Sequence, residues 1–241
     1  MTLKANIWLT ERVVATLSQM CHLVMTRETY IITTPPPNFN GHDYVDLGLP
    51  SGTLWATMNV GASKPSDYGL LFQWGDTVGY RADQVGTGDG QKKFSWADYK
   101  WNPNGDGKTF TKYTTTGATL ELEDDAAHVN MGGDWHMPSP DQIDELLDNT
   151  TNDLTTLDGV NGMKFTSKKD TSKSMFIPIG YNADNGSFLG EGVFSDFWCS
   201  TMLSDSANKS YTFVIDSFSA QWLYVEPRQR YYGLSVRGVV G

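Results

Sequence analysis

Cysteine is scarce in this chain: its 241 residues include two, Cys21 and Cys199, far apart in the sequence. A small secreted domain held by disulfides carries more cysteines, and a structural zinc site needs four ligands at close spacing. Long apolar runs are also missing, since none approaches the ~20 residues of a membrane span. The sequence therefore predicts no disulfide framework, no metal or other cofactor, and no membrane insertion.

Positive charge is in short supply as well. Lys and Arg together number 18 against 28 Asp and Glu, so the net charge is −10 and the pI is about 4.7. A chain of this charge is repelled by phosphate backbones, and its few basic residues form no stripe. The composition argues against nucleic acid as a partner.

A secretory signal peptide is not evident at the N-terminus. The run VVATLSQMC, residues 13–21, has the outline of a lipoprotein cleavage site. Glu11 and Arg12 interrupt the apolar stretch, however, and Gln19 and Met20 stand where small residues are expected before the cysteine. The analysis of this segment therefore predicts no signal peptide in this chain.

Aromatic residues and glycine are abundant. The chain has 8 Trp, 11 Tyr, 11 Phe, 24 Gly and 10 Pro. This composition supports a substantial core with many turns and few long helices. Its length favours one large domain with an appendage, and three consecutive prolines, Pro35–Pro37, suggest the connector. We expect an N-terminal segment at 1–40 and a single domain at 41–241.

The N-terminal segment carries an apolar stripe. Its spacing across residues 10–26 is helical, with Thr10 as a suitable N-cap, and a short strand is expected at 30–33. An isolated helix of this length is marginal in water. We therefore expect the stripe to serve oligomerisation or attachment; it consists of Val13, Leu17, Met20 and Val24.

The domain reads as short strands between glycine, asparagine and aspartate turns. One helix is predicted at 140–149, capped by Ser139, and residues 81–118 are predicted to form a long polar loop excursion. The expected strands are 44–47, 54–58, 175–179, 211–215 and 234–240.

Three stretches have a specific pattern that periodicity does not explain. They are HDYVDLGLPSGTLWATMNVGA at 42–62, DAAHVNMGGDWHMPSPDQIDELL at 125–147 and RYYGLSVRGVV at 230–240. Together they resemble a large bacterial and phage family with a C-type-lectin-like fold, the major paralogous domain, over about residues 41–240. The resemblance implies an α+β, C-type-lectin-like fold with short strands, few helices and long loops, beside the N-terminal helical segment. It also implies a binding module.

The resemblance carries structural expectations. The closing strand at 234–240 should pair near the strand at 44–47, and Arg237 should be partly buried and hydrogen-bonded. Four tryptophans fall where the family has buried aromatics: Trp55, Trp74, Trp135 and Trp198.

Two alternatives to a binding module remain open. One is an enzyme related to the formylglycine-generating enzymes of this fold, which use a pair of cysteines; Cys199 has no cysteine near it in the sequence. The other is a structural subunit of a pilus or baseplate. Two polar stretches, 102–107 (NPNGDG) and 123–125 (EDD), could hold a cation, but turn formation and helix capping explain them more simply.

One branch of this fold family comprises the variable proteins of diversity-generating retroelements, including phage tropism determinants, whose C-terminal segment is rewritten at adenines. In this chain Phe197, Cys199, Leu223 and Tyr224 are compatible with such rewriting. Four other residues cannot arise from an asparagine AAC codon by adenine changes alone: Gln221, Trp222, Glu226 and Gln229. Diversification and an ordinary loop surface both remain open.

The same segment holds the candidate binding residues, because exposed aromatic and arginine side chains carry most interface energy. We expect them to cluster on one exposed face and to bind a cell-surface protein or glycan receptor. The resemblance further suggests a phage tail or bacterial cell surface as the location, and a homotrimer through residues 10–26. The candidates are Phe194, Asp196, Phe197, Trp222, Leu223, Tyr224, Glu226 and Arg228.

Overall fold

The computed structural model describes residues 37–218 and 222–241; of Trp222 it describes the backbone. The helix expected at 10–26, the strand at 30–33 and the proline-rich connector lie outside the described residues. Within the described part, no helix is long and apolar enough to cross a membrane.

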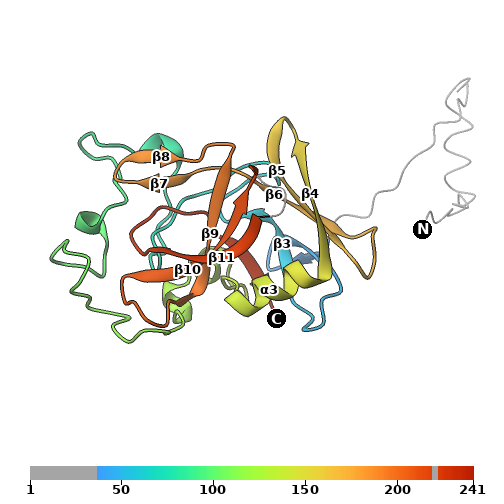
Figure 1. Cartoon of the computed structure of the whole chain (residues 1–241), viewed down its shortest axis with the longest axis horizontal. Coiled ribbons are helices and arrows are strands. Elements are labelled where there is room, and N and C mark those ends of the chain that lie inside the picture. Colours follow the sequence, from blue (N-terminus) through green and yellow to red (C-terminus); the bar gives the residue numbers. More distant parts are fainter. Residues whose placement is uncertain (1–36, 219–221) are drawn as a thin grey trace, which may run out of the picture. The chain divides into compact units, whose positions relative to one another are not determined.

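Antiparallel strands dominate the architecture (Figure 1). A four-stranded sheet has the order β1-β2-β3-β12, two three-stranded sheets have the orders β4-β5-β6 and β11-β10-β9, and β7 pairs with β8. The strands are β1 (Asn38–Phe39), β2 (His42–Val45), β3 (Leu54–Asn59), β4 (Thr150–Leu157), β5 (Val160–Ser167), β6 (Ser174–Pro178), β7 (Asn182–Asp184), β8 (Ser187–Leu189), β9 (Phe194–Met202), β10 (Lys209–Asp216), β11 (Trp222–Gln229) and β12 (Arg237–Val240).

The predicted α+β class is wrong. Of the described residues, 38% are in strands and 12% in helices, so the fold is β-rich. The described residues contain two α-helices, α2 (Ala126–Met131) and α3 (Pro140–Asn149), and three short 3-10 helices at Ala82–Gln84, Trp96–Asp98 and Leu122–Asp124. The sequence analysis missed the hairpin of β4 and β5, which adds sixteen strand residues between α3 and β6.

The turn of this hairpin has a clear cause in the sequence. Asp158 and Gly159 have φ angles of 51° and 80°, and both lie in the left-handed region. A two-residue turn with positive φ at both positions matches the right-handed twist of the flanking strands, and Asp-Gly is among its preferred sequences. All eight residues of β4 pair with β5 as a result.

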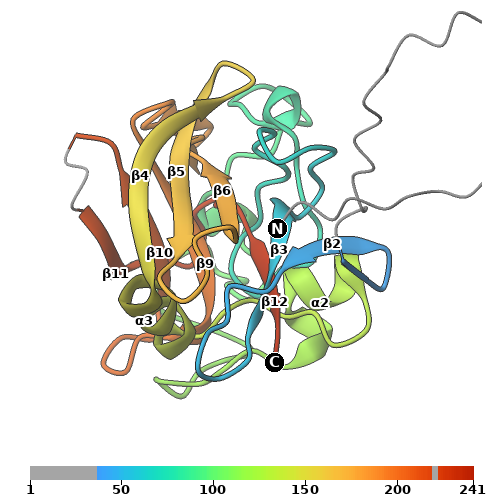
Figure 2. The ribbon, with the colours of Figure 1, turned by 90° about the vertical axis from the view of Figure 1, so that its right-hand side faces the viewer.

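One hydrophobic core lies between the two three-stranded sheets and α3. Figure 2 shows the sheet of β4, β5 and β6 in front of β9, β10 and β11, with α3 below both. Phe165 of β5 contacts Phe213 of β10 with ring centroids 6.0 Å apart, and Ile143 and Leu146 of α3 are buried in the same cluster. This packing fixes which face of the β9-β10-β11 sheet points inward.

A second core contains three of the four buried tryptophans. It gathers residues from β3, α2, the second half of β9 and the C-terminal segment around Trp74, Trp135 and Trp198. All four tryptophans predicted to be buried are 0% exposed, Trp55 being in the first core. The Trp198 indole donates a hydrogen bond to the carbonyl of Phe72 at 2.7 Å, so its polar atom is satisfied as well.

Several predicted elements are confirmed. Helix α3 spans the predicted residues. The Ser139 hydroxyl caps it by accepting a hydrogen bond from the Gln142 N–H, and the Gln142 side-chain oxygen accepts one from the Ser139 N–H. The closing strand β12 pairs with β3, which in turn pairs with β2. Arg237 is 1% exposed and donates to the carbonyls of Ala56 and Phe176.

The long excursion at 81–118 is mostly loop, as predicted, but side chains anchor it. Asp98 accepts hydrogen bonds from the backbone N–H groups of residues 93–95. Arg230, fully buried, donates to the Tyr113 carbonyl and lies 4.4 Å from the Phe110 ring centroid. The excursion is therefore fastened to the C-terminal segment.

Candidate ligand-binding face

Strand alternation divides the β9-β10-β11 sheet into two faces. Side chains of successive residues in a strand point to opposite sides. Phe197 of β9 pairs with Phe213 of β10, which pairs with Val225 of β11, and all three belong to or pack on the first core. The next row is Asp196, Val214 and Tyr224, and it must point the other way. We call that side the outer face.

The outer face brings together most of the predicted residues. By register, Phe194, Asp196 and Tyr224 share it, and so do Glu226 and Arg228 at alternate positions along β11. Phe194, Tyr224, Glu226 and Arg228 are half-buried. Trp222 lies opposite Asp216 and has the same register, but its side chain is outside the described part. Two segments distant in sequence thus form one surface.

Two predicted residues point toward the first core and away from the outer face. Phe197 is 2% exposed and packs against Phe213, and Leu223 is half-buried against the first core. Both occupy odd positions, on the side of the sheet that packs on the first core, so pleating places them inward. The prediction that Phe197 and Leu223 lie on the exposed face is wrong.

Asp196 lies on the outer face but is itself 0% exposed, which also corrects the prediction of an exposed carboxylate. The guanidinium of Arg228 pairs with Asp196 and with Glu226, so it lies between a buried and a half-exposed carboxylate. Burial raises the pKa of Asp196, and the Arg228 charge acts against this shift. The Oδ1 atom of Asp196 is buried and has no hydrogen-bond partner among the described residues.

Four residues near this face are absent from the predicted set. Tyr231 and Tyr232 follow β11, where the chain crosses toward the β9 edge, and their rings are 4.9 Å apart. Burial raises the pKa of Tyr231, and the neighbouring Tyr232 and Asp184 of β7 shift it in the same direction. Asp216 of β10 acts on Tyr224 electrostatically. Both tyrosines lie in the third sequence motif, at 230–240.

Cys199 provides no reactive thiol. It is 0% exposed in the first core, and burial raises its pKa above the usual value. A thiol nucleophile needs thiolate character and access. Cys21 lies outside the described residues.

The carboxylates at 121–125 pair with lysine side chains or cap a helix. The Lys112 ammonium pairs with Glu121, Glu123 and Asp124, whose carboxylates would otherwise be close enough to share a metal ion. Asp125 caps α2 by accepting from the His128 N–H, as predicted. These carboxylates therefore serve the structure of the chain.

The polar side chains of the NPNGDG stretch at 102–107 also have hydrogen-bond partners close by in the sequence. Asn102 accepts from the Gly107 N–H and donates to Asp106 and to the carbonyl of Thr109. Asp106 accepts from the N–H groups of Lys108 and Thr109. The oxygen atoms that could bind calcium are engaged in forming a turn.

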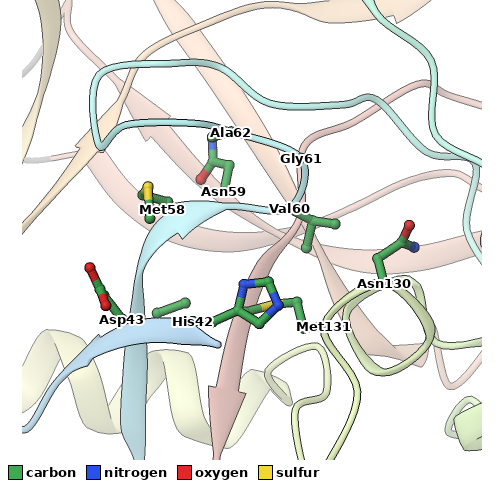
Figure 3. A pocket seen from close by; sticks show the side chains of 10 residues that line it. His42, Asp43, Met58, Asn59, Val60, Gly61, Ala62, Asn130 and Met131 are labelled. Carbon is green, nitrogen blue, oxygen red and sulfur yellow. The ribbon is translucent and has the colours of Figure 1, made fainter. Parts of the chain in front are cut away.

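The described pockets lie away from the outer face. A pocket of about 230 Å³ lies where β2, the end of β3 and α2 meet (Figure 3). His42, Asn59 and Asn130 are among its lining residues, and the Asn130 amide donates to backbone carbonyls of Thr77 and Ala126. Two shallower depressions of about 350 and 400 Å³ contain none of the predicted binding residues either.

No family model matches this chain, and neither does any curated protein or any solved structure. The resemblance to the major paralogous domain family therefore stands on the three sequence motifs.

Proposed function

We propose that this protein is a ligand-binding protein that recognises a receptor on another cell through the outer face of the β9-β10-β11 sheet. The observation that carries the proposal is the set of aromatic and charged side chains on the side of the sheet that faces away from the first core. It includes Phe194, Tyr224, Glu226 and Arg228, drawn from two distant segments. The receptor is a cell-surface protein or glycan.

The physical character of the face supports recognition. Tyrosine rings give a large contact area at low entropic cost, and they combine an apolar body with a polar tip. Arg228 is held by two carboxylates, so its guanidinium has a fixed position before any partner arrives. A preorganised surface loses less conformational entropy on binding. The family resemblance supports the same function, on a phage tail or a bacterial surface.

Diversification of this face receives less support. Of the four residues compatible with rewriting at adenines, Phe197 and Cys199 are buried and Leu223 packs on the core. Random replacement of buried side chains changes their volume and destabilises a fold. We therefore propose a fixed binding surface.

Binding to intact cells tests the function. Fluorescently labelled protein would be screened by flow cytometry against a panel of bacterial strains, and each strain that binds would be tested again with Tyr224→Ala. If Tyr224 is a binding hot spot, we expect a loss of roughly 2 kcal/mol or more of binding free energy. Leu154→Ala is the matched control, because Leu154 is 46% exposed on β4 of the other three-stranded sheet. Equal binding by the wild type and Tyr224→Ala would argue against this face.

A further inference from the structure

Strand β4 has an open edge. It ends the order β4-β5-β6, and all eight of its residues pair with β5 in an unbroken register (Figure 2). In an antiparallel pair, half of the N–H and C=O groups of each strand point away from the partner strand. Among the described residues, no backbone group outside β5 bonds to residues 151–157, and five of the eight β4 residues are exposed. The strand therefore offers a row of free backbone donors and acceptors.

The edges of two other strands are covered by neighbouring segments. Strand β9 is bordered by the C-terminal segment, where the Trp198 N–H donates to the Ser235 carbonyl. Strand β12 exchanges two hydrogen bonds with the loop before α3, between Val239 and His136. Neither edge is free to pair with another chain.

The remaining edges carry other forms of protection. Unpaired edges invite association, and proteins guard them with proline, charged side chains, bulges or short strands. Strand β11 contains Pro227 between Glu226 and Arg228. Strand β6 ends at Pro178, and β1, β7 and β8 have two or three residues each. Strand β4, with the sequence TTNDLTTL, has no proline, no basic residue and no bulge, and its open edge is long.

Two side chains beside this edge indicate what an added strand would contain. Asp153 and Leu157 are four positions apart and share one side of the strand. Asp153 is exposed and has no ion pair or side-chain hydrogen bond among the described residues, although Lys164 is opposite it in register. Leu157 is 37% exposed and lines a depression of about 350 Å³ with Lys164 and Phe176. Opposite charges and apolar pairs directly across two strands stabilise a sheet.

We propose that β4 binds an extended segment of a partner protein, which adds to the sheet as a further strand. The segment has a basic residue opposite Asp153 and an apolar residue four positions away, opposite Leu157. An extended backbone is the ligand that matches a row of alternating donors and acceptors, and side-chain pairs along the edge give specificity. The net charge of −10 also disfavours an acidic segment.

This edge is a second binding surface, separate from the outer face of the β9-β10-β11 sheet. It goes beyond the proposed function, because its partner need not be the receptor on another cell. The backbone of β4 carries the interaction, and Leu154→Ala leaves that backbone unchanged. That variant therefore still serves as the control for the outer face.

Amide hydrogen exchange of the full chain, followed by NMR, tests the inference with three synthetic peptides. The first consists of threonine and valine with a lysine and a leucine four positions apart. The second has glutamate in place of the lysine. The third has the side chains of the first, but its central backbone nitrogens are methylated and cannot donate hydrogen bonds.

We expect the lysine peptide to bind in a saturable manner and to slow exchange by about tenfold or more at alternate residues within 151–157. Those are the N–H groups that point away from β5, so the alternation distinguishes an added strand from a ligand held by side chains. The glutamate peptide should bind more weakly, and the methylated peptide should leave the exchange unchanged.

A charge-matched pair of variants locates the effect on the protein. Asp153→Asn removes the charge beside the edge, and we expect the affinity for the lysine peptide to fall by about threefold. Asp89→Asn removes a charge from an exposed position on the excursion and should leave the affinity unchanged. Thermal melting of both variants checks that the fold is retained.

Three results would overturn the inference: no saturable binding of the lysine peptide, equal binding of the methylated peptide, or slowed exchange that does not alternate along β4. Protection of 151–157 that rises with protein concentration, without any peptide, would overturn it as well, because a second copy of the chain would then cover the edge. Failure of the proposed function is seen separately, as cell binding that Tyr224→Ala does not change.

Discussion

Phe197 and Tyr224 lie on opposite faces of one sheet, and this difference determines the role of each residue. Phe197 is 2% exposed among the side chains of the first core, 6.3 Å from the Phe213 ring, while Tyr224 is half-buried on the outer face. We expect Phe197→Ala to lower the free energy of unfolding by roughly 3–5 kcal/mol. Tyr224→Ala should cost about 1 kcal/mol.

Urea unfolding followed by fluorescence measures both. Phe197→Leu is the control, because it removes less volume and should cost less than about 1.5 kcal/mol. A Phe197→Ala variant as stable as the wild type would mean that Phe197 is not part of the core.

At the residue scale, the sequence was a good guide to which large side chains are buried. It was a poorer guide to the side of a strand on which a residue lies. The predicted burial of Trp198 and Arg237 is confirmed: Trp198 falls where the family has a buried aromatic, and Arg237 lies in the third motif. Phe197 and Leu223 were assigned to the surface because their segments show no clean alternation of polar and apolar residues. Once the register with β10 is known, period-2 geometry settles both cases.

The excursion at 81–118 depends on Asp98 for its shape. Burial acts to raise the pKa of Asp98, but the N–H donors of residues 93–95 and the Lys92 charge outweigh it and hold that pKa below its usual value. A carboxyl whose pKa is lower in the folded state contributes stability above the unfolded pKa, ~3.9, and loses it as the pH falls through the folded value.

Asp98→Asn should therefore cost about 1–3 kcal/mol at pH 7, because an amide has one acceptor oxygen where the carboxylate has two. The difference from the wild type should begin to shrink below about pH 4, where the carboxyl of the unfolded chain takes up a proton, and should vanish only below the lowered pKa of folded Asp98. Urea unfolding at pH 7 and pH 3 measures the difference, and hydrogen exchange reports whether the excursion opens first. A pH-independent difference would show that the carboxylate charge contributes nothing.

At the scale of elements, the prediction of α3 succeeded and that of β4 and β5 failed for separate reasons. Helix α3 has a capping box and a proline at its start. Both are local sequence signals of a helix N-terminus. Strand β4 is an edge strand with the sequence TTNDLTTL, and five of its eight residues are exposed, so it shows no buried alternation. The Asp-Gly turn was the available signal, and it requires the following strand as context.

At the scale of the molecule, the three motifs correctly indicated that the beginning and end of the domain meet. Strand β12 pairs with β3, and the Val239 carbonyl accepts a bond from the His136 N–H, so all three motifs contribute to one neighbourhood. The predicted α+β class is wrong because the helices of the described residues are few and short. The surroundings of the proposed binding face could not be predicted in full, since Asp184 and Tyr231 meet only through the crossing of the chain after β11.

The association state is the remaining prediction at this scale. The apolar stripe lies outside the described residues and consists of Val13, Leu17, Met20 and Val24. Its helical spacing predicts a helix that needs a partner in water. We expect the full chain to sediment as a homotrimer, with three times the 26.8 kDa mass of one chain. A shortened chain beginning at Asn40 should sediment as a monomer.

Leu17→Glu in the full chain tests the role of the stripe apart from that of the rest of the segment, because a charge in an apolar seam should dissociate the trimer. Monomeric masses for the full and shortened chains alike would refute association through residues 10–26.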